Sequence, residues 1–172
     1  MSPPSVDNKV SWVRGSGNLK NNCYLVLGAE IYPDESNDYK WGHSKSHIEC
    51  RESCRGKGGN LASVHSQEEN RFIFSMLGGN YRGPPFRRTM LGARGPGYTE
   101  TVCPRACFQT SLPMGWIDGT NWGEFTMWSD GHPKSSWECL YIGDKSTGPE
   151  WISDTCNQEQ KFDCACKKAA FT

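Results

Sequence analysis

The sequence lacks a net charge and any long apolar run. Its 172 residues carry 19 lysines and arginines against 19 aspartates and glutamates, so no long-range field of one sign attracts phosphates or an anionic membrane surface. No run of 18 apolar residues is present, which argues against a membrane-spanning helix. We therefore expect a soluble protein that neither binds nucleic acid nor inserts into membranes.

The sequence motifs of the common enzyme classes are also missing. No GxSxG, HExxH, P-loop or dinucleotide-binding fingerprint occurs. Ser63 and His65 share one face of a strand if LASVHS is extended, but the sequence offers no third member to orient the histidine. We expect no enzymatic activity.

The chain begins without a recognisable signal peptide, because MSPPSVDNKV has neither a basic nor an apolar region. It also has no Asn-x-Ser/Thr sequon, so N-linked sugar is not expected on any face. Nine cysteines are nonetheless present, and reducing compartments rarely keep so many thiols paired. We expect a secreted or extracellular protein whose signal sequence has been removed.

The chain length fits one domain, and local patterns predict both helices and strands. Residues 1–20 are polar, and residues 23–32 are rich in strand-forming residues. Residues 44–57 have no proline and end at Gly58-Gly59, which predicts a helix. Ser66 to Glu69 form a capping box in which the serine hydroxyl accepts from the third helical residue while Glu69 reaches back. A second helix should follow, with Phe72, Ile73, Met76 and Leu77 on one face.

Beyond residue 79 short apolar segments alternate with long loops rich in glycine, proline and polar residues, which predicts an α+β fold. Residues 94–136 are too long for a simple connection, and structureless loops of such length inside a compact domain are usually either functional or wrongly assigned. Within them, WIDGTNWGEFTMWSDGHP (116–133) contains three of the seven tryptophans among turn residues, a composition that suits neither an amphipathic helix nor an ordinary strand.

An ordered set of landmarks resembles the C-type lectin-like domain. It comprises GGNLASVHSQEEN (58–70), LGA (91–93), WIDG (116–119), Phe125, Trp128, Gly131-x-Pro133, Cys139, Trp151, Cys156 and Phe162-x-Cys164. The resemblance spans residues 23–166 and implies a disulfide-stapled fold with two helices, small antiparallel sheets and a long loop region. We place this domain at residues 21–168, with a polar tail at 1–20 and a short tail at 169–172.

In the resembled family the tryptophans of the long loop pack inward and the remaining loop surface faces a ligand. Burial of aromatic rings offsets the ordering entropy of an irregular loop, roughly 1 to 2 kcal/mol per residue. We expect Trp116, Trp128 and Trp151 in the core, and Trp122 and Trp137 as exposed contacts. Pro133 falls where the family shapes its loop with a cis bond.

The resemblance also implies cysteine pairs. Its framework pairs are Cys54 with Cys164 and Cys139 with Cys156. A second bridge, Cys50 to Cys166, fits beside the first because each of these cysteines shares a face with a framework neighbour. Cys103 and Cys107 are close enough in sequence to staple an insertion at residues 94–113.

Cys23 is left as an odd thiol, and several outcomes remain open for it. It could pair with Cys50, which would leave Cys166 free, or it could link two chains into a dimer. His43, His47, Cys50 and Cys54 have a zinc-like spacing, but the four cannot meet one ion, because eleven helical residues rise about 16 Å while the ligands of one zinc ion must converge. An adjacent pair could still join ligands from elsewhere, and we expect bridged cysteines and solvated histidines instead.

Sugar-binding members of the family hold calcium through oxygen ligands in two triplets, as calcium requires. Here the triplets read His132-Pro133-Lys134 and Trp151-Ile152-Ser153, which offer few suitable oxygens. We therefore expect no cofactor, and in particular no calcium at the principal site. Glu138 and Asp154, each one residue out of register, leave calcium binding at a rearranged site as the alternative.

We expect a non-enzymatic module that binds a glycan or an extracellular protein through its long loop. The candidate contacts are Trp122, His132, Lys134, Trp137, Glu138 and Asp154. One alternative is a calcium-dependent lectin with a rearranged site. Another is a structural protein joined through the odd cysteine.

Overall fold

The computed structural model describes residues 11–27, 31–33, 39–41, 47–76, 88–101, 109–111, 114–145, 148–156 and 163–170. Its main sheet has seven strands. Six follow the order β1 (Val13–Arg14), β2 (Asn22–Leu27), β13 (Asp163–Ala169), β6 (Thr89–Met90), β11 (Cys139–Lys145) and β12 (Gly148–Asp154), and β5 (Asn60–Leu61) pairs with β13. The β13–β6 pair is parallel and the other pairs are antiparallel.

Three two-stranded ribbons accompany the main sheet. They are β3 (Ile31–Pro33) with β4 (Tyr39–Trp41), β7 (Ala93–Arg94) with β10 (Gly115–Trp116), and β8 (Thr99–Thr101) with β9 (Gln109–Ser111). Together with two helices and three disulfides, they confirm the predicted α+β, disulfide-stapled fold.

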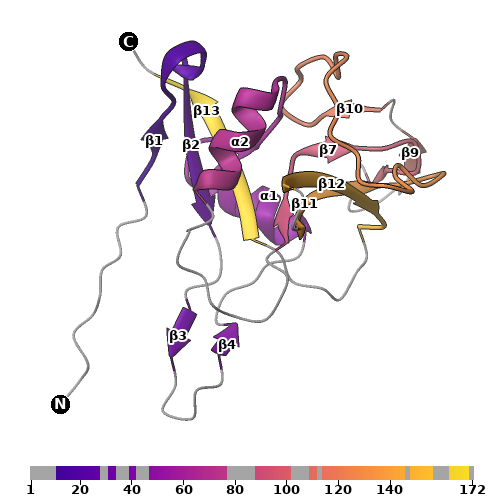
Figure 1. Cartoon of the computed structure of the whole chain (residues 1–172). Coiled ribbons are helices and arrows are strands. Elements are labelled where there is room, and N and C mark those ends of the chain that lie inside the picture. The colour runs from indigo at the N-terminus through magenta and orange to yellow at the C-terminus, as the bar shows by residue number, and fades with distance from the viewer. Residues whose placement is uncertain are drawn as a thin grey trace.

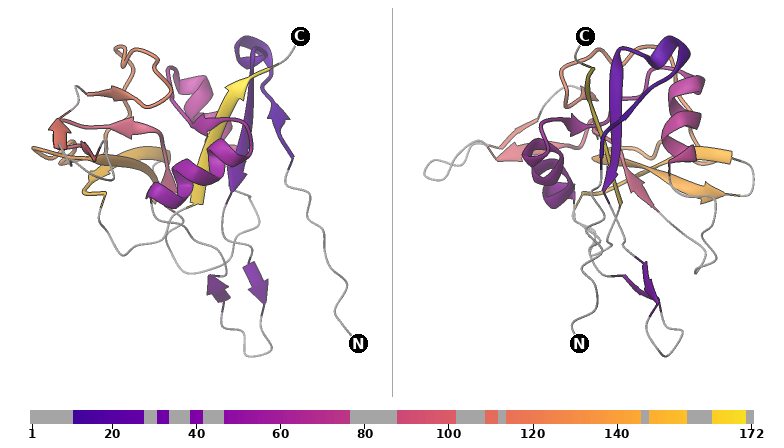
Figure 2. Two further views of the ribbon diagram at one scale, coloured as in Figure 1. Left: turned by 180° about the vertical axis from the view of Figure 1, so that it is seen from behind. Right: turned by 90° about the vertical axis from the view of Figure 1, so that its left-hand side faces the viewer.

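The two helices are α1 (His47–Gly56) and α2 (Gln67–Ser75), and they cover opposite faces of β2 and β13 (Figure 1; Figure 2, right). Ser66 caps α2 as predicted, because its Oγ accepts from the Glu69 backbone N–H at 3.1 Å. The Glu69 carboxylate turns inward instead of completing the capping box, and its Oε2 accepts from the backbone N–H of His65 at 2.8 Å.

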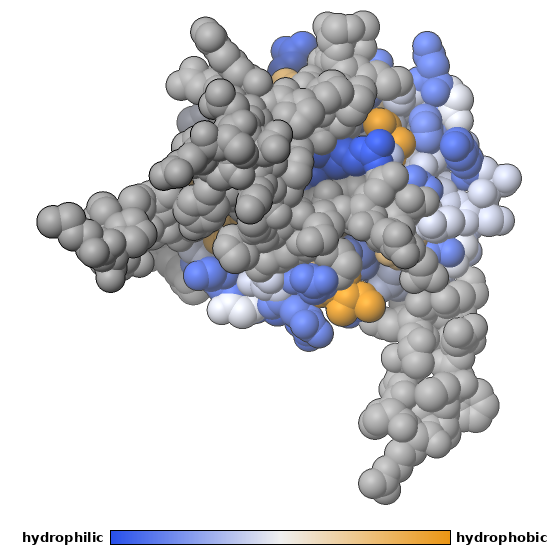
Figure 3. All heavy atoms as spheres, turned by 90° about the horizontal axis from the view of Figure 1, so that it is seen from below, coloured by the Kyte–Doolittle hydropathy of each residue, from blue (hydrophilic) through white to orange (hydrophobic). Residues whose placement is uncertain are grey.

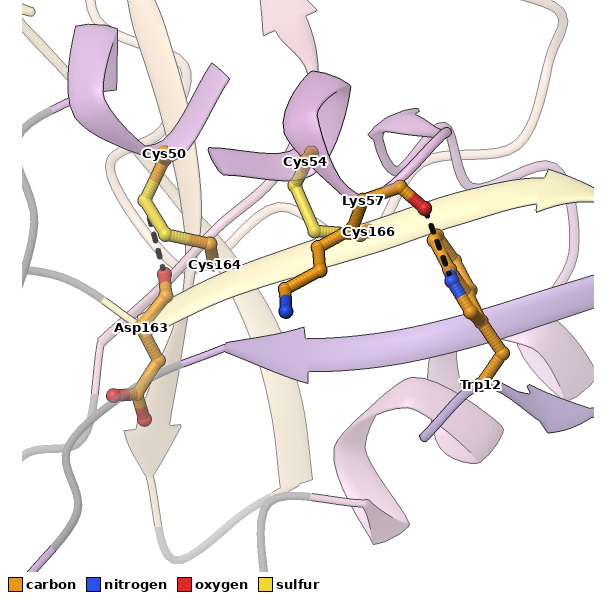
Figure 4. The surroundings of a disulfide bond; sticks show 7 residues. All are labelled: Trp12, Cys50, Cys54, Lys57, Asp163, Cys164 and Cys166. Atoms are coloured by element: carbon orange, nitrogen blue, oxygen red, sulfur yellow. Dashed lines mark hydrogen bonds between the residues drawn. A yellow bond between two sulfur atoms is a disulfide. The ribbon is translucent and has the colours of Figure 1, made fainter. Parts of the chain in front are cut away.

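The folded part begins earlier than the boundary that we placed at residue 21. Strand β1 pairs with β2, and Leu19, at the end of a short 3-10 helix (Gly17–Leu19), is buried in the core. Trp12 attaches this segment to the end of α1, because its Nε1 donates to the Lys57 carbonyl at 3.2 Å (Figure 4). The Lys168 ammonium on β13 lies 4.6 Å from the centroid of the Trp12 ring.

The framework bridges between α1 and β13 have other partners than the resemblance implied. Cys50 is bonded to Cys164 and Cys54 to Cys166 (Figure 4), so the expected pairs Cys54–Cys164 and Cys50–Cys166 are wrong. Because α1 and β13 run in the same direction where they touch, the earlier cysteine of the helix meets the earlier cysteine of the strand. The same four cysteines still form two adjacent bridges.

The third bridge joins Cys139 to Cys156, as predicted. Cys23 is a free, partly buried thiol, and the expected Cys103–Cys107 pair lies outside the described residues. The two large clusters of the core therefore differ in chemistry. The one on the α1 side contains five of the six cysteines of these bridges, with Cys156 packed against it, and the one beneath α2 and the long loop contains buried tryptophans.

In the view from below, the described hydrophobic residues form small separate spots (Figure 3). Among the described residues, the large hydrophobic side chains with high exposure are Val13, Ile48 and Met114. No helix in the described part of the chain combines the length and the apolar character needed to cross a bilayer.

Candidate binding site in the long loop region

Residues 114–138, here called the long loop, are organised around a cluster of aromatic rings. Trp116 and Trp151 lie at its centre and are fully buried. Trp122 stacks on Trp116 with ring centroids 4.8 Å apart. Trp128 meets Trp151 edge-on at 5.7 Å, and Phe125 does the same at 5.5 Å. The expected core role of Trp116 and Trp151 is confirmed, and Trp128 is partly buried against the same cluster.

The backbone of the long loop is also tied to strand β12. The Trp151 N–H donates to the Met127 carbonyl at 2.6 Å, and the Ser129 N–H donates to the Trp151 carbonyl at 2.9 Å. The indole N–H of Trp151 donates to Asn70 Oδ1 on α2 at 2.8 Å. Trp151 thus connects the loop, the sheet and a helix, which satisfies polar groups that an irregular buried segment would otherwise leave unpaired.

Of the two tryptophans expected as exposed contacts, Trp137 is buried, with 4% of its surface exposed. Its backbone carbonyl accepts from Gly97 at 2.9 Å, and a Cβ atom at Gly95 would overlap its ring. Trp137 is therefore not available to a ligand, because the insertion that begins at residue 94 packs over it. Trp122 is partly buried and has its ring against Trp116, Trp128, Trp137 and Trp151.

His132 and Lys134 flank Pro133, and both are hydrogen-bonded to Ser153 on β12. The His132–Pro133 peptide bond is cis, the form that the resemblance implied. His132 Nδ1 lies 2.8 Å from Ser153 Oγ and accepts from the Ser153 backbone N–H at 3.1 Å. The Lys134 backbone N–H donates to the same Oγ at 2.9 Å. We call the His132–Ser153–Lys134 arrangement the serine clasp.

The carboxylates of Glu138 and Asp154, both in the candidate set, accept hydrogen bonds from nearby backbone N–H groups. Glu138 Oε2 accepts from the Cys156 N–H at 2.8 Å, and Asp154 Oδ1 accepts from the Thr155 N–H at 2.8 Å. Among the described residues, the His, Cys, Asp and Glu side chains that converge closely enough for one metal ion are His47, Cys139 and Cys156. Glu138 and Asp154 are not in that group, and its two sulfurs are bonded to each other.

His47 is buried beside Tyr98, with ring centroids 6.0 Å apart. Burial, together with the charge of Arg51, lowers the pKa of His47 to about 4, so the ring is neutral at physiological pH. Its Nε2 has no hydrogen-bond partner among the residues that the structure describes. Such an orphan atom inside a protein calls for a physical explanation.

Sequence reasoning missed the part played by Asp118, in WIDG. Ser63 Oγ donates to Asp118 Oδ2, and the Thr120 N–H donates to Oδ1 at 2.9 Å. Burial raises the pKa of Asp118, but the hydrogen bonds from Ser63 and Thr120 and the charge of Lys167 outweigh it and hold the pKa below its usual value. An aspartate beside a glycine at the start of an irregular loop is the signal that could have identified this role.

A buried polar network continues from Asp118 into the core. Lys167 Nζ donates to Ser63 Oγ at 3.2 Å and pairs with Glu69 Oε1 at 2.5 Å. Tyr24 donates to the same Glu69 oxygen at 2.6 Å, and burial, followed by the interaction with Glu69, raises the Tyr24 pKa. The network anchors the first turn of the long loop to β13 and α2, and it gives Ser63 and His65 different partners, since His65 Nε2 lies 3.0 Å from Thr120 Oγ1.

Known proteins resemble this chain in sequence and in fold. No protein-family model matches the sequence. Rheacalcin-1 of Rhea americana is 24% identical over 154 residues, which cover 90% of this chain and 94% of that protein. The C-type lectin domain of murine dendritic cell inhibitory receptor 2, solved in complex with N-glycan, superposes with a TM-score of 0.60 at 23% identity over 92% of this chain and 96% of that chain. The chain folds as a C-type lectin-like domain.

Other C-type lectin-like relatives vary in length and in calcium use. Mouse C-type lectin domain family 4 member A is 28% identical over 86% of this chain, which spans half the length of that protein. A calcium-independent type II antifreeze protein has the same fold, with a TM-score of 0.57 at 18% identity over 93% of this chain and 92% of that chain. The chain thus has the fold of a family of non-enzymatic binding proteins.

Proposed function

We propose that this C-type lectin-like domain acts outside the cell and binds a glycan or protein ligand through its long loop, without calcium at the family's principal site. The serine clasp is the observation that carries the proposal. It joins the cis-proline segment directly to the triplet of β12, the two places where sugar-binding relatives supply calcium ligands. An imidazole nitrogen and a serine hydroxyl bond to each other there, whereas calcium requires six to eight oxygens.

The composition of the loop rim supports ligand binding over the aromatic cluster. Exposed side chains of the rim are polar or charged with both signs: Thr120, Asn121, Glu124, Thr126, Asp130 and Lys134. Such groups can bond to sugar hydroxyls or to peptide, while the rings below hold them in place. Two structural neighbours were solved with or in the presence of oligosaccharide, which favours glycans as the first ligands to test.

The test is a glycan and protein ligand screen run in calcium and again in a chelator. We expect a ligand whose binding is equal in both buffers. Lys134→Ala should weaken that binding by up to about tenfold, as for a rim contact, and Lys20→Ala, an exposed lysine outside the long loop, is the matched control.

The two alternative functions give different results in the same experiments. Binding that disappears in the chelator and returns with calcium would establish a calcium-dependent lectin and contradict our proposal. A mass that halves on reduction, combined with no ligand in either buffer, would instead indicate a structural protein linked through Cys23.

A further inference from the structure

The bridge between Cys139 and Cys156 lies against the buried His47 imidazole. The His47 ring nitrogen and the two sulfurs all lie within 4.8 Å of one another. His47 is 3% exposed and its Nε2 is the orphan polar atom described above. A buried donor or acceptor without a partner destabilises a fold, so this placement is unfavourable while the sulfurs remain bonded to each other.

We propose that reduction of the Cys139–Cys156 bridge creates a zinc site formed by His47 and the two cysteine thiolates. Zinc binds sulfur at about 2.3 Å and nitrogen at about 2.0 Å in a tetrahedron. Ligand atoms around one ion are thus a little under 4 Å apart, and the nitrogen and the two sulfurs already lie within 4.8 Å of one another. Once their bond is broken the sulfurs need only move apart, and the fourth position is open to water.

The reaction balances with a dithiol as reductant. The dithiol supplies two electrons and two protons, becomes a cyclic disulfide, and leaves the Cys139 and Cys156 sulfurs as thiols. Zinc then binds the two thiolates and releases both protons, as metal binding by cysteine requires.

Burial makes this bridge the first that a reductant reaches. Cys156 is partly exposed, whereas Cys50, Cys54, Cys164 and Cys166 are at most 1% exposed. Thiol–disulfide exchange needs access to a sulfur, so a mild dithiol should open Cys139–Cys156 while both bridges between α1 and β13 remain closed. The two closed bridges, which span 114 and 112 residues, would keep α1, which carries His47, attached to β13.

The experiment treats the intact oxidised chain with increasing dithiol, alkylates the free thiols and maps them. Cobalt(II) is added to the partly reduced protein as a spectroscopic probe for zinc. We expect one cobalt ion per chain with thiolate charge-transfer and tetrahedral visible bands, and displacement of that ion by zinc. Zinc should also protect Cys139 and Cys156, and not Cys23, from alkylation.

His47→Phe removes the nitrogen ligand and keeps a flat ring beside Tyr98. Loss of an outer-shell partner lowers metal affinity by about 10-fold to 100-fold, and we expect a larger fall in cobalt affinity for His47→Phe. His65→Phe, which lies outside the cluster, should leave the cobalt affinity unchanged. Equal affinity in His47→Phe would overturn the site. So would opening of the α1–β13 bridges before Cys139–Cys156, or the absence of selective zinc protection in the unmodified chain, a result that does not depend on any variant folding.

Discussion

The two sides of the main sheet are stabilised by different chemistry. On the α1 side, two adjacent disulfides join a regular helix to a regular strand. On the other side, an irregular loop is held by stacked and edge-on tryptophans and by hydrogen bonds to β12. The contrast shows that covalent bonds fix the scaffold, while the candidate ligand-binding surface depends on non-covalent burial that single substitutions can remove.

The largest effect should come from the covalent side. One α1–β13 bridge can be removed by Cys50→Ala with Cys164→Ala, and the other by Cys54→Ala with Cys166→Ala. Either change should lower the free energy of unfolding by about 3 kcal/mol or less, because the remaining bridge still joins α1 to β13 and closes the chain between them. Removing the second bridge as well should destabilise the fold by a further 4 to 5 kcal/mol or so, since more than one hundred residues are then released.

Urea unfolding of the two single-bridge variants and of the four-cysteine variant measures this coupling. Whichever bridge is removed first, its removal should lower the free energy of unfolding by less than the later removal of the other bridge. Strictly additive losses would show that each bridge stabilises the fold independently of the other. The covalent part of the comparison between the two sides would then be wrong.

On the loop side, Trp151→Ala should destabilise the domain by about 3 to 5 kcal/mol, the usual loss for a large buried aromatic side chain. It removes the centre of the ring cluster and leaves Asn70 Oδ1 without its indole partner. Trp122→Ala should be milder, because Trp122 is only partly buried. Thermal melting of both variants checks the order, and a larger loss for Trp122 would contradict the assignment of Trp151 as the central ring.

The acid sensitivity of the α1 side should depend on His47. Its pKa is about 4 in the folded state against about 6.5 unfolded, so between these values the unfolded state binds more protons. Stability is therefore complete above pH 6.5 and falls as the pH drops toward 4, by up to about 3 kcal/mol at 1.36 kcal/mol per pKa unit.

His47→Phe should flatten this part of the stability profile. Urea unfolding at pH 7, 5.5 and 4.5 tests it, with His65→Phe as the control at an exposed histidine. A slope that persists in His47→Phe would show that another group titrates in this window.

The smallest effect should be that of Ser153→Ala, which removes the hydroxyl from the serine clasp. The loss of hydrogen bonds to His132 and Lys134 should lower stability by about 1 to 2 kcal/mol, because the Ser153 backbone N–H can still donate to His132. Ligand binding should fall in the same variant if the clasp positions Lys134. Thermal melting and ligand titration together separate these effects, and unchanged stability would exclude the clasp as a structural contact.

The sequence allowed the fold to be predicted because its signals are local or come in a fixed order. Ser66 marks the start of α2, and the landmarks around Trp116, Trp128 and Trp151 identify the long loop. The disulfide partners of Cys50 and Cys54 could not be predicted, since both pairings put each cysteine on the correct face and only the relative direction of α1 and β13 decides between them.

The candidate site was harder to predict, because its residues depend on contacts between distant segments. Trp137 is buried because residues 95–97 pack over it, and Glu69 turns inward because Lys167 and Tyr24, far away in sequence, meet its carboxylate. The serine clasp also depends on tertiary structure: the sequence shows that calcium ligands are missing at residues 132–134 and 151–153, but not that the two triplets bond to each other.

Calcium titration followed by thermal melting tests the central claim most directly, since any ion that binds the native state must raise the melting temperature. We predict the same melting temperature in calcium and in chelator. A rise in calcium that is lost in Asp154→Asn or Glu138→Gln would place an ion at the loop and contradict the calcium-free account.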